Sequence, residues 1–340
     1  QKEEPLKDLL LRIREETDAI KYTDLAVRIK EKADVLLLEK KFDEAFPALL
    51  VFLDHASPLS GLSNDIRSTA IDKLTSFLTA ETLKYVIGKV SVKGEEHGSA
   101  QHMLLRGGDQ SIELLLGALI EAPDAVSRRN LFNTALMFGK KIIPHVEKYF
   151  TSDQWYVVRQ MVSLLGELGD PASIDAIITA YGHPDIRIKK EALKSLSRIQ
   201  SPMSNGFLLK ALEETDPSLM TQAVISLGML RDPLAVEPIA RIALKWEPFS
   251  ENQEPKKEAI KALGIIGDGK AVPCLAKVLS RKAWFGKKIN EEVRLLAANA
   301  LGMIQGPEAD EALRAASGGS SGEIHNVCKR ILEGREKKAI

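Results

Sequence analysis

The chain has 340 residues, of which 44% are hydrophobic and 5% aromatic, and its 47 Lys and Arg residues balance its 47 Asp and Glu residues. This length exceeds the size at which one hydrophobic core stops growing, so we expect two domains or an elongated stack of repeats. The zero net charge argues against a general attraction to nucleic acid or anionic lipid. Only two cysteines, Cys274 and Cys328, are present, which excludes a disulfide framework and favours a reducing, cytoplasmic setting.

Residues 1–60 predict an N-terminal helical capping segment. An apolar stripe at helical spacing runs from Leu6 to Ile13, and residues 23–40 and 42–53 predict a helical hairpin. Because the sequence begins at Gln1 rather than Met, we expect that a preceding segment is missing. No apolar run approaches the roughly 18 residues of a membrane span.

We expect degenerate repeats over residues 61–150. Residues 66–78, 98–106 and 111–120 keep a helical periodicity there but lack the signature that recurs further along the chain. Residues 84–93 alternate loosely in polarity and also fit a strand. A helix that ends near Val90 fits the surrounding spacing better.

A short phrase of a small residue, Leu and Gly recurs between residues 135 and 302, with Ser in the Gly place in one copy. Successive copies are 27, 31, 31, 36 and 38 residues apart, and they end at Gly139, Gly166, Ser197, Gly228, Gly264 and Gly302. A period in this range is the mark of a stacked-repeat architecture.

Each copy predicts a pair of antiparallel helices. Val293, Ala297, Ala300 and Leu301 form an apolar stripe on one helix, and Gly and Pro residues separate it from the next helix. Three second helices are each preceded by an aspartate whose carboxylate is expected to cap the free amides, namely Asp153, Asp185 and Asp216. Because neither helix can bury its apolar face alone, the pairs must stack. The sequence therefore predicts an all-α, right-handed α-α superhelical solenoid of roughly 19–20 helices, with regular repeats and a C-terminal cap over residues 151–340.

The repeat pattern resembles HEAT repeats, in the short form found in bacterial and phycobilisome-lyase-like repeat proteins. Asp-Pro between helices, the pair Val293-Arg294 and the phrase ending at Gly302 carry this resemblance, which is specific over residues 155–305 and weaker over 65–150. It implies an armadillo-like solenoid that binds other proteins.

The residues that would carry metal or nucleophile chemistry do not form a recognisable motif. His97 and His102 lie five positions apart, which does not place them on one helix face. HEAT-repeat deoxyhypusine hydroxylases bind iron through His-Glu dipeptides, and this sequence contains none. Cys274 and Cys328 lie among helix-periodic apolar residues and are expected to be buried. We therefore predict no catalytic residue, no metal site and no cofactor.

Basic residues recur at equivalent positions of the second helices, seven and three residues before the terminal Gly or Ser. They are Arg159, Lys190, Lys194, Lys257 and Lys261. One interpretation is a solvated helix face that Glu191 and Glu258 neutralise locally. The other is a shallow basic stripe that binds an acidic peptide or protein.

The two longest repeats have insertions at residues 246–255 and 281–290, and each insertion brings a Trp and a Phe. These residues are Trp246, Phe249, Trp284 and Phe285. Insertions in a solenoid form loops along one edge, often the binding edge. The aromatic rings either cover helix ends or bind a partner.

The resulting hypothesis is a non-catalytic protein-protein interaction scaffold or adaptor, with a protein or peptide partner that is acidic if the basic stripe is the binding surface. The alternative is a HEAT-like DNA-binding or alkylpurine DNA glycosylase-type protein, in which Trp155, Trp246 and Trp284 line a concave face. The neutral net charge argues against that alternative. Lyases for bilin attachment share the repeat but offer no residue signature to place on this sequence.

Overall fold

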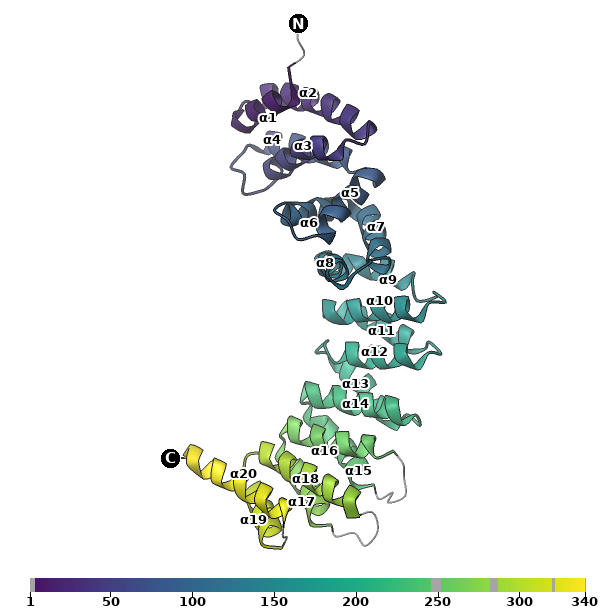
Figure 1. Cartoon of the computed structure of the whole chain (residues 1–340), viewed down its shortest axis with the longest axis vertical. Coiled ribbons are helices and arrows are strands. Elements are labelled where there is room, and N and C mark those ends of the chain that lie inside the picture. The colour runs from purple at the N-terminus through teal and green to yellow at the C-terminus, as the bar shows by residue number, and fades with distance from the viewer. Residues whose placement is uncertain (1–3, 246–251, 282–286, 320–321, 340) are drawn as a thin grey trace. The chain divides into compact units, whose positions relative to one another are not determined.

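The computed structural model describes residues 4–245, 252–281, 287–319 and 322–339, and within them all regular secondary structure is helical. The chain forms two compact units, residues 1–145 and 146–340. The described residues form twenty α-helices and five short 3-10 turns, and the helices stack as antiparallel pairs inside each unit (Figure 1). The predicted all-α stack of helix pairs is confirmed.

The first unit contains eight helices. They are α1 (Leu6–Glu15), α2 (Ala19–Leu38), α3 (Phe42–His55), α4 (Asn64–Phe77), α5 (Ala80–Ser91), α6 (His97–Arg106), α7 (Gly108–Ile120) and α8 (Ala125–Leu136). Residues 84–91 of the segment that also fitted a strand lie in α5, where Leu83, Val86, Ile87 and Val90 bury one face of the helix. The short helix α9 (Ile143–Glu147) contains the boundary between the units.

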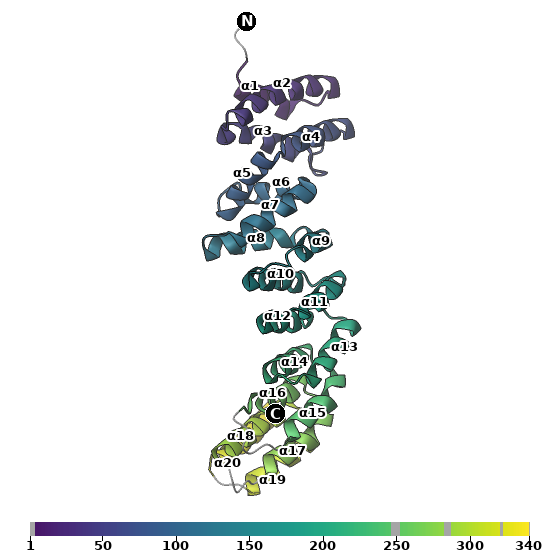
Figure 2. The ribbon, with the colours of Figure 1, turned by 90° about the vertical axis from the view of Figure 1, so that its right-hand side faces the viewer.

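The second unit is built from two layers of helices (Figure 2). The even layer consists of α10 (Trp155–Leu168), α12 (Ile186–Leu196), α14 (Pro217–Leu230), α16 (Glu254–Ile266), α18 (Lys287–Met303) and α20 (Glu323–Ala339). The odd layer consists of α11 (Ile174–Tyr181), α13 (Pro202–Lys210), α15 (Val236–Leu244), α17 (Val272–Ser280) and α19 (Pro307–Gly319). Each even helix contacts the next even helix along the stack.

Local sequence sets several of the helix ends. Asp185 accepts a hydrogen bond from the amide of Arg187, and Asp216 accepts bonds from the amides of Ser218 and Leu219, so both cap even helices as expected. At α10 the expected cap Asp153 is wrong, because the helix begins after Gln154, which makes no side-chain capping bond.

The recurring phrase has a packing explanation. At Gly166, Gly228 and Gly264, the Gly lies against a small residue of the next even helix, two positions before that helix's own terminal Gly or Ser. A Cβ atom added to Gly166 would lie 2.8 Å from the Cα of Ser195, and one added to Gly264 would lie 2.8 Å from the Cα of Ala300. The Gly therefore allows two helix backbones to approach more closely than any side chain would permit.

We predict that Gly264→Ala destabilises the second unit even though Ala is the better helix former. The added methyl group meets the backbone of α18, and overpacking of this kind costs about 1–3 kcal/mol. Gly334 is the matched control, because it lies inside α20, is exposed, and a Cβ added there meets nothing within 4 Å. Gly334→Ala should leave stability unchanged or raise it by up to about 1 kcal/mol. Urea unfolding followed by circular dichroism would measure both, and equal effects of the two substitutions would contradict the close-packing explanation.

Candidate functional site

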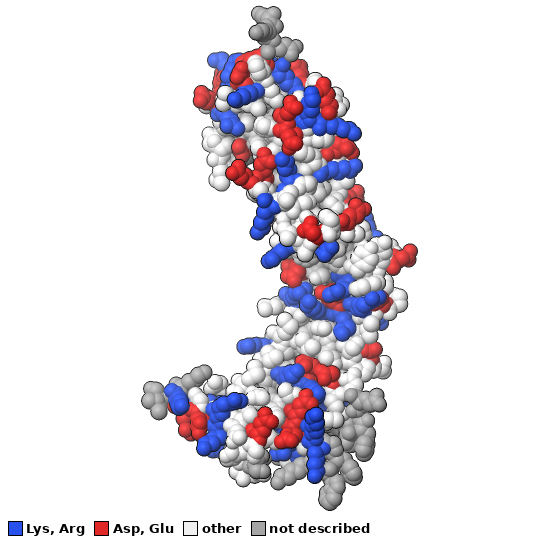
Figure 3. Space-filling view, viewed as in Figure 1, with Lys and Arg blue, Asp and Glu red and all other residues white. Residues whose placement is uncertain are grey.

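The five predicted basic residues lie on the even layer of the second unit. Arg159 comes from α10, Lys190 and Lys194 from α12, and Lys257 and Lys261 from α16. Figure 3 shows Lys and Arg side chains gathered over α12, with Asp and Glu side chains among them. The equivalent positions of α14 are Thr221 and Ile225 and those of α18 are Leu295 and Asn299, so the basic row is interrupted.

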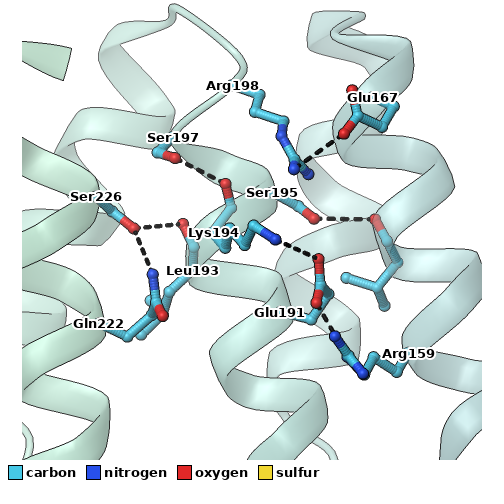
Figure 4. Close-up of polar contacts among 11 residues, drawn as sticks. Arg159, Glu167, Glu191, Leu193, Lys194, Ser195, Ser197, Arg198, Gln222 and Ser226 are labelled. Atoms are coloured by element: carbon cyan, nitrogen blue, oxygen red, sulfur yellow. Dashed lines mark hydrogen bonds and ion pairs between the residues drawn. The ribbon is translucent and has the colours of Figure 1, made fainter. Parts of the chain in front are cut away.

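Glu191 is the centre of the α12 group. Its carboxylate accepts a hydrogen bond from Nε of Arg159 at 3.1 Å and lies 3.9 Å from Nζ of Lys194 (Figure 4). The Glu191 side chain is only 5% exposed, whereas those of Arg159 and Lys194 are 50% and 47% exposed. Because a buried carboxylate is costly without a partner, the two cations hold it between α10 and α12.

The same region contains further bonds between neighbouring even helices. The hydroxyl of Ser195 donates to the carbonyl oxygen of Val162, and that of Ser226 donates to the carbonyl oxygen of Leu193, each at 3.1 Å (Figure 4). Arg198 pairs with Glu167 at 2.9 Å. These contacts fix α10, α12 and α14 relative to one another, so the exposed side chains between them are presented on a rigid surface.

Lys190 lies near the start of α14. Hydrogen bonds from Ser218 and Leu219, with a weaker contribution from the positive charge of Lys190, lower the pKa of Asp216. At the start of α12, a hydrogen bond from Arg187 lowers the pKa of Asp185 to about 2. Both aspartates are therefore ionised at neutral pH and add negative charge beside the α12 cations.

The α16 cations also have carboxylate partners. Nζ of Lys257 lies 2.7 Å from Glu292 of α18 and 3.7 Å from Glu254, and Nζ of Lys261 lies 2.6 Å from Glu258. The hydrogen bond with Glu292 is the main cause of the raised pKa of Lys257. Glu191 and Glu258, which were expected to neutralise the basic residues if these form a solvated helix face, thus lie beside them. The second interpretation, a stripe that binds an acidic partner, stays a prediction.

The four aromatic residues of the two insertions lie outside the residues that the structure describes. They are Trp246, Phe249, Trp284 and Phe285. The third tryptophan, Trp155, is half-buried on α10, and the guanidinium of Arg187 lies 3.5 Å from its ring centroid. This cation–π contact was not anticipated from the sequence. The sequence feature that could have predicted it is the spacing of about one repeat between Trp155 and Arg187, which places them on neighbouring even helices.

Both cysteines are buried, as expected. Burial raises the pKa of Cys274 to about 11 and raises that of Cys328 as well, which disfavours the thiolate that a nucleophile requires. No group of three or more His, Cys, Asp or Glu residues in the described part of the chain is arranged to hold a metal ion. Among those same residues, no helix is long and apolar enough to cross a membrane.

Two family models match the chain. Residues 143–204 match the model of HEAT repeats, and residues 293–318 match that of the PBS lyase HEAT-like repeat. The first match covers α10 to α12, where the Glu191 group lies, and the second covers much of α18 and α19. No curated protein matches the sequence.

Several solved structures are similar at low identity. Human deoxyhypusine hydroxylase is 19% identical, with a TM-score of 0.33, and the match covers 78% of this chain and 99% of that one. A structure of CpcE and CpcF of phycocyanin lyase from Nostoc sp. PCC7120 is also 19% identical, with a TM-score of 0.32 and coverages of 75% and 95%. Kap95p in complex with RanGDP is 10% identical, with a TM-score of 0.45 and coverages of 98% and 52%. The two family matches place HEAT repeats at residues 143–204 and a HEAT-like repeat at residues 293–318, within the stack of closely packed even helices.

Proposed function

We propose that this chain is a non-catalytic scaffold or adaptor that binds a protein or peptide partner. The observation that carries the proposal is the even layer of the second unit, whose helices present equivalent side chains in register on one exposed face. Stacked repeats of this kind provide extended binding surfaces without a dedicated pocket.

The basic residues of this face are the proposed contacts for an acidic partner. Arg159, Lys194 and Lys261 keep between 45% and 50% of their side chains exposed while they are ion-paired. A partner carboxylate must compete with the internal carboxylates, and exposed ion pairs of this type are weak and screened by salt. Binding through the stripe should therefore be modest in affinity and should weaken as the salt concentration rises.

DNA binding is the second candidate function. The cations gathered over α12 and the nearby Trp155 are the observations that favour it. The interspersed carboxylates and the zero net charge oppose it, because a protein that follows a phosphate backbone needs a surplus of positive charge.

We expect that reversing the charge of Lys190, Lys194, Lys257 and Lys261 to Glu abolishes partner binding. Because Lys194 and Lys257 also pair with Glu191 and Glu292, circular dichroism must first show that the variant keeps the helical content of the wild type. The partner is first identified by affinity capture with the wild-type chain and mass spectrometry, and is then titrated against purified variants by calorimetry. A matched control reverses four exposed lysines elsewhere, Lys7, Lys21, Lys93 and Lys210, which changes the net charge by the same amount.

Equal losses in the two variants would show that only net charge matters, and unchanged binding in the first would favour the solvated-face interpretation. The same wild-type protein is titrated with a generic DNA duplex. Micromolar binding that falls steeply with salt would favour the DNA-binding alternative instead.

A further inference from the structure

The turns that lead from an even helix to the next odd helix share one backbone design. Three of them place the residue after the even helix in the left-handed region: Gly169 at φ 66°, Arg231 at φ 53° and Gly267 at φ 76°. Each is followed by an aspartate whose side chain accepts a hydrogen bond from the amide two residues later. Two of these turns differ at only three positions, since residues 167–172 read Glu-Leu-Gly-Asp-Pro-Ala and residues 229–234 read Met-Leu-Arg-Asp-Pro-Leu.

The backbone does not explain the arginine in the second turn. A left-handed conformation is strained for any residue with a Cβ atom. The two sister turns, which begin at Gly169 and Gly267, use glycine at this position. The fold would therefore be at least as stable with glycine in place of Arg231. Strained positions of this kind cluster at sites where proteins bind something.

The turn is nevertheless held firmly. Asp232 is only 8% exposed, and its carboxylate accepts hydrogen bonds from the amide of Leu234 and from Nδ2 of Asn205 on α13, each at 2.9 Å. The side chains that project from this turn are thus fixed by a buried anchor in the neighbouring repeat. Rigid presentation lowers the entropy cost of binding a partner.

Those side chains combine exposed apolar groups with a free charge. Met229 is 65% exposed and Leu234 is 73% exposed, and Arg231 between them has no ion pair with any residue that the structure describes. Met203, 50% exposed, occupies the position of Leu234 in the preceding turn of the stack. By contrast, the sister turn at residues 167–172 presents Glu167 and Ala172 at the positions of Met229 and Leu234.

We propose that Met203, Met229, Arg231 and Leu234 form an edge site that binds a protein segment in which a carboxylate stands beside large apolar side chains. A guanidinium pairs with a carboxylate in a two-bonded, directional contact. Methionine and leucine beside it offer an adaptable apolar surface, and Arg is enriched at the energetic centres of interfaces. The inference rests on the proposed scaffold function, but it assigns the contact to residues other than the basic stripe.

The sister turn supplies the decisive variant. The triple substitution Met229→Glu, Arg231→Gly and Leu234→Ala converts residues 229–234 into the sequence that already folds at residues 167–172. Short random peptides displayed on phage are selected against the immobilised wild-type chain after removal of all phage that bind the triple variant. We expect the enriched peptides to carry Asp or Glu next to Leu, Ile or Phe.

Selected peptides are then titrated by fluorescence anisotropy. Arg231→Gly alone should weaken binding at least tenfold while the thermal unfolding midpoint stays the same or rises, and replacing the acidic residue of the peptide by Lys should cause a similar loss. Failure to enrich any peptide, enrichment of peptides without acidic residues, or unchanged binding by Arg231→Gly would each overturn the proposal.

The two proposals can fail separately. Loss of the edge site with retained capture of a partner through the basic stripe would overturn only the edge site. A captured partner that is indifferent to the stripe variant but lost with Arg231→Gly would move the scaffold function from the stripe to the edge.

Discussion

Leu227→Ala should lower the free energy of unfolding by about 2–5 kcal/mol, and Leu301→Ala should do the same. Each leucine immediately precedes the Gly of the recurring phrase, on α14 and on α18, and each is completely buried between the two layers of the second unit. Truncation removes apolar contacts and leaves a cavity that the close-packed helices cannot fill. Urea denaturation followed by circular dichroism would measure the change.

Leu59→Ala is the control for this prediction. Leu59 is 94% exposed in the loop between α3 and α4, so its truncation should change stability by no more than about 0.5 kcal/mol. A loss below that value at Leu227 or Leu301 would contradict the packing described for the even layer.

Arg335→Gln should destabilise the C-terminal helices by about 2–4 kcal/mol. The guanidinium of Arg335 donates hydrogen bonds to the carbonyl oxygens of Leu301, Gly302 and Ile304 at 2.8, 2.8 and 2.6 Å, and it pairs with Asp310 of α19. Its side chain is only 18% exposed. The last carbonyl groups of an α-helix have no partner within that helix, so this one side chain from α20 caps α18 and ties α18, α19 and α20 together.

Native-state hydrogen exchange would locate the effect of Arg335→Gln. Because stability in stacked repeats depends on neighbouring contacts, protection should fall mainly in α18, α19 and α20 and not in α10 or α12. Arg330→Gln, at an exposed position of the same helix, should leave protection unchanged. Uniform loss of protection across the second unit, or no loss at all, would contradict the capping role.

The sequence by itself determined those parts of the structure that depend on residues close together in the chain. The recurring phrase predicted paired helices, and the aspartates before Ile186 and Pro217 predicted helix starts that the structure confirms. Residues 84–93 were resolved in favour of a helix by periodicity alone, and the structure agrees. Helical periodicity and capping act within a few residues, so a single sequence contains the information that they require.

Tertiary structure alone decided which groups meet across repeats. Glu191 lies between Arg159 and Lys194, and Arg335 reaches the end of α18 more than 30 residues away. The repeat period indicates that such residues lie on neighbouring helices, but a rotation or a shift of one helix along another would pair different side chains. The close contacts made by Gly166 and Gly264 fix that rotation and shift. They exist only when two helices are packed together, which is why the pairing of charges had to come from the folded stack.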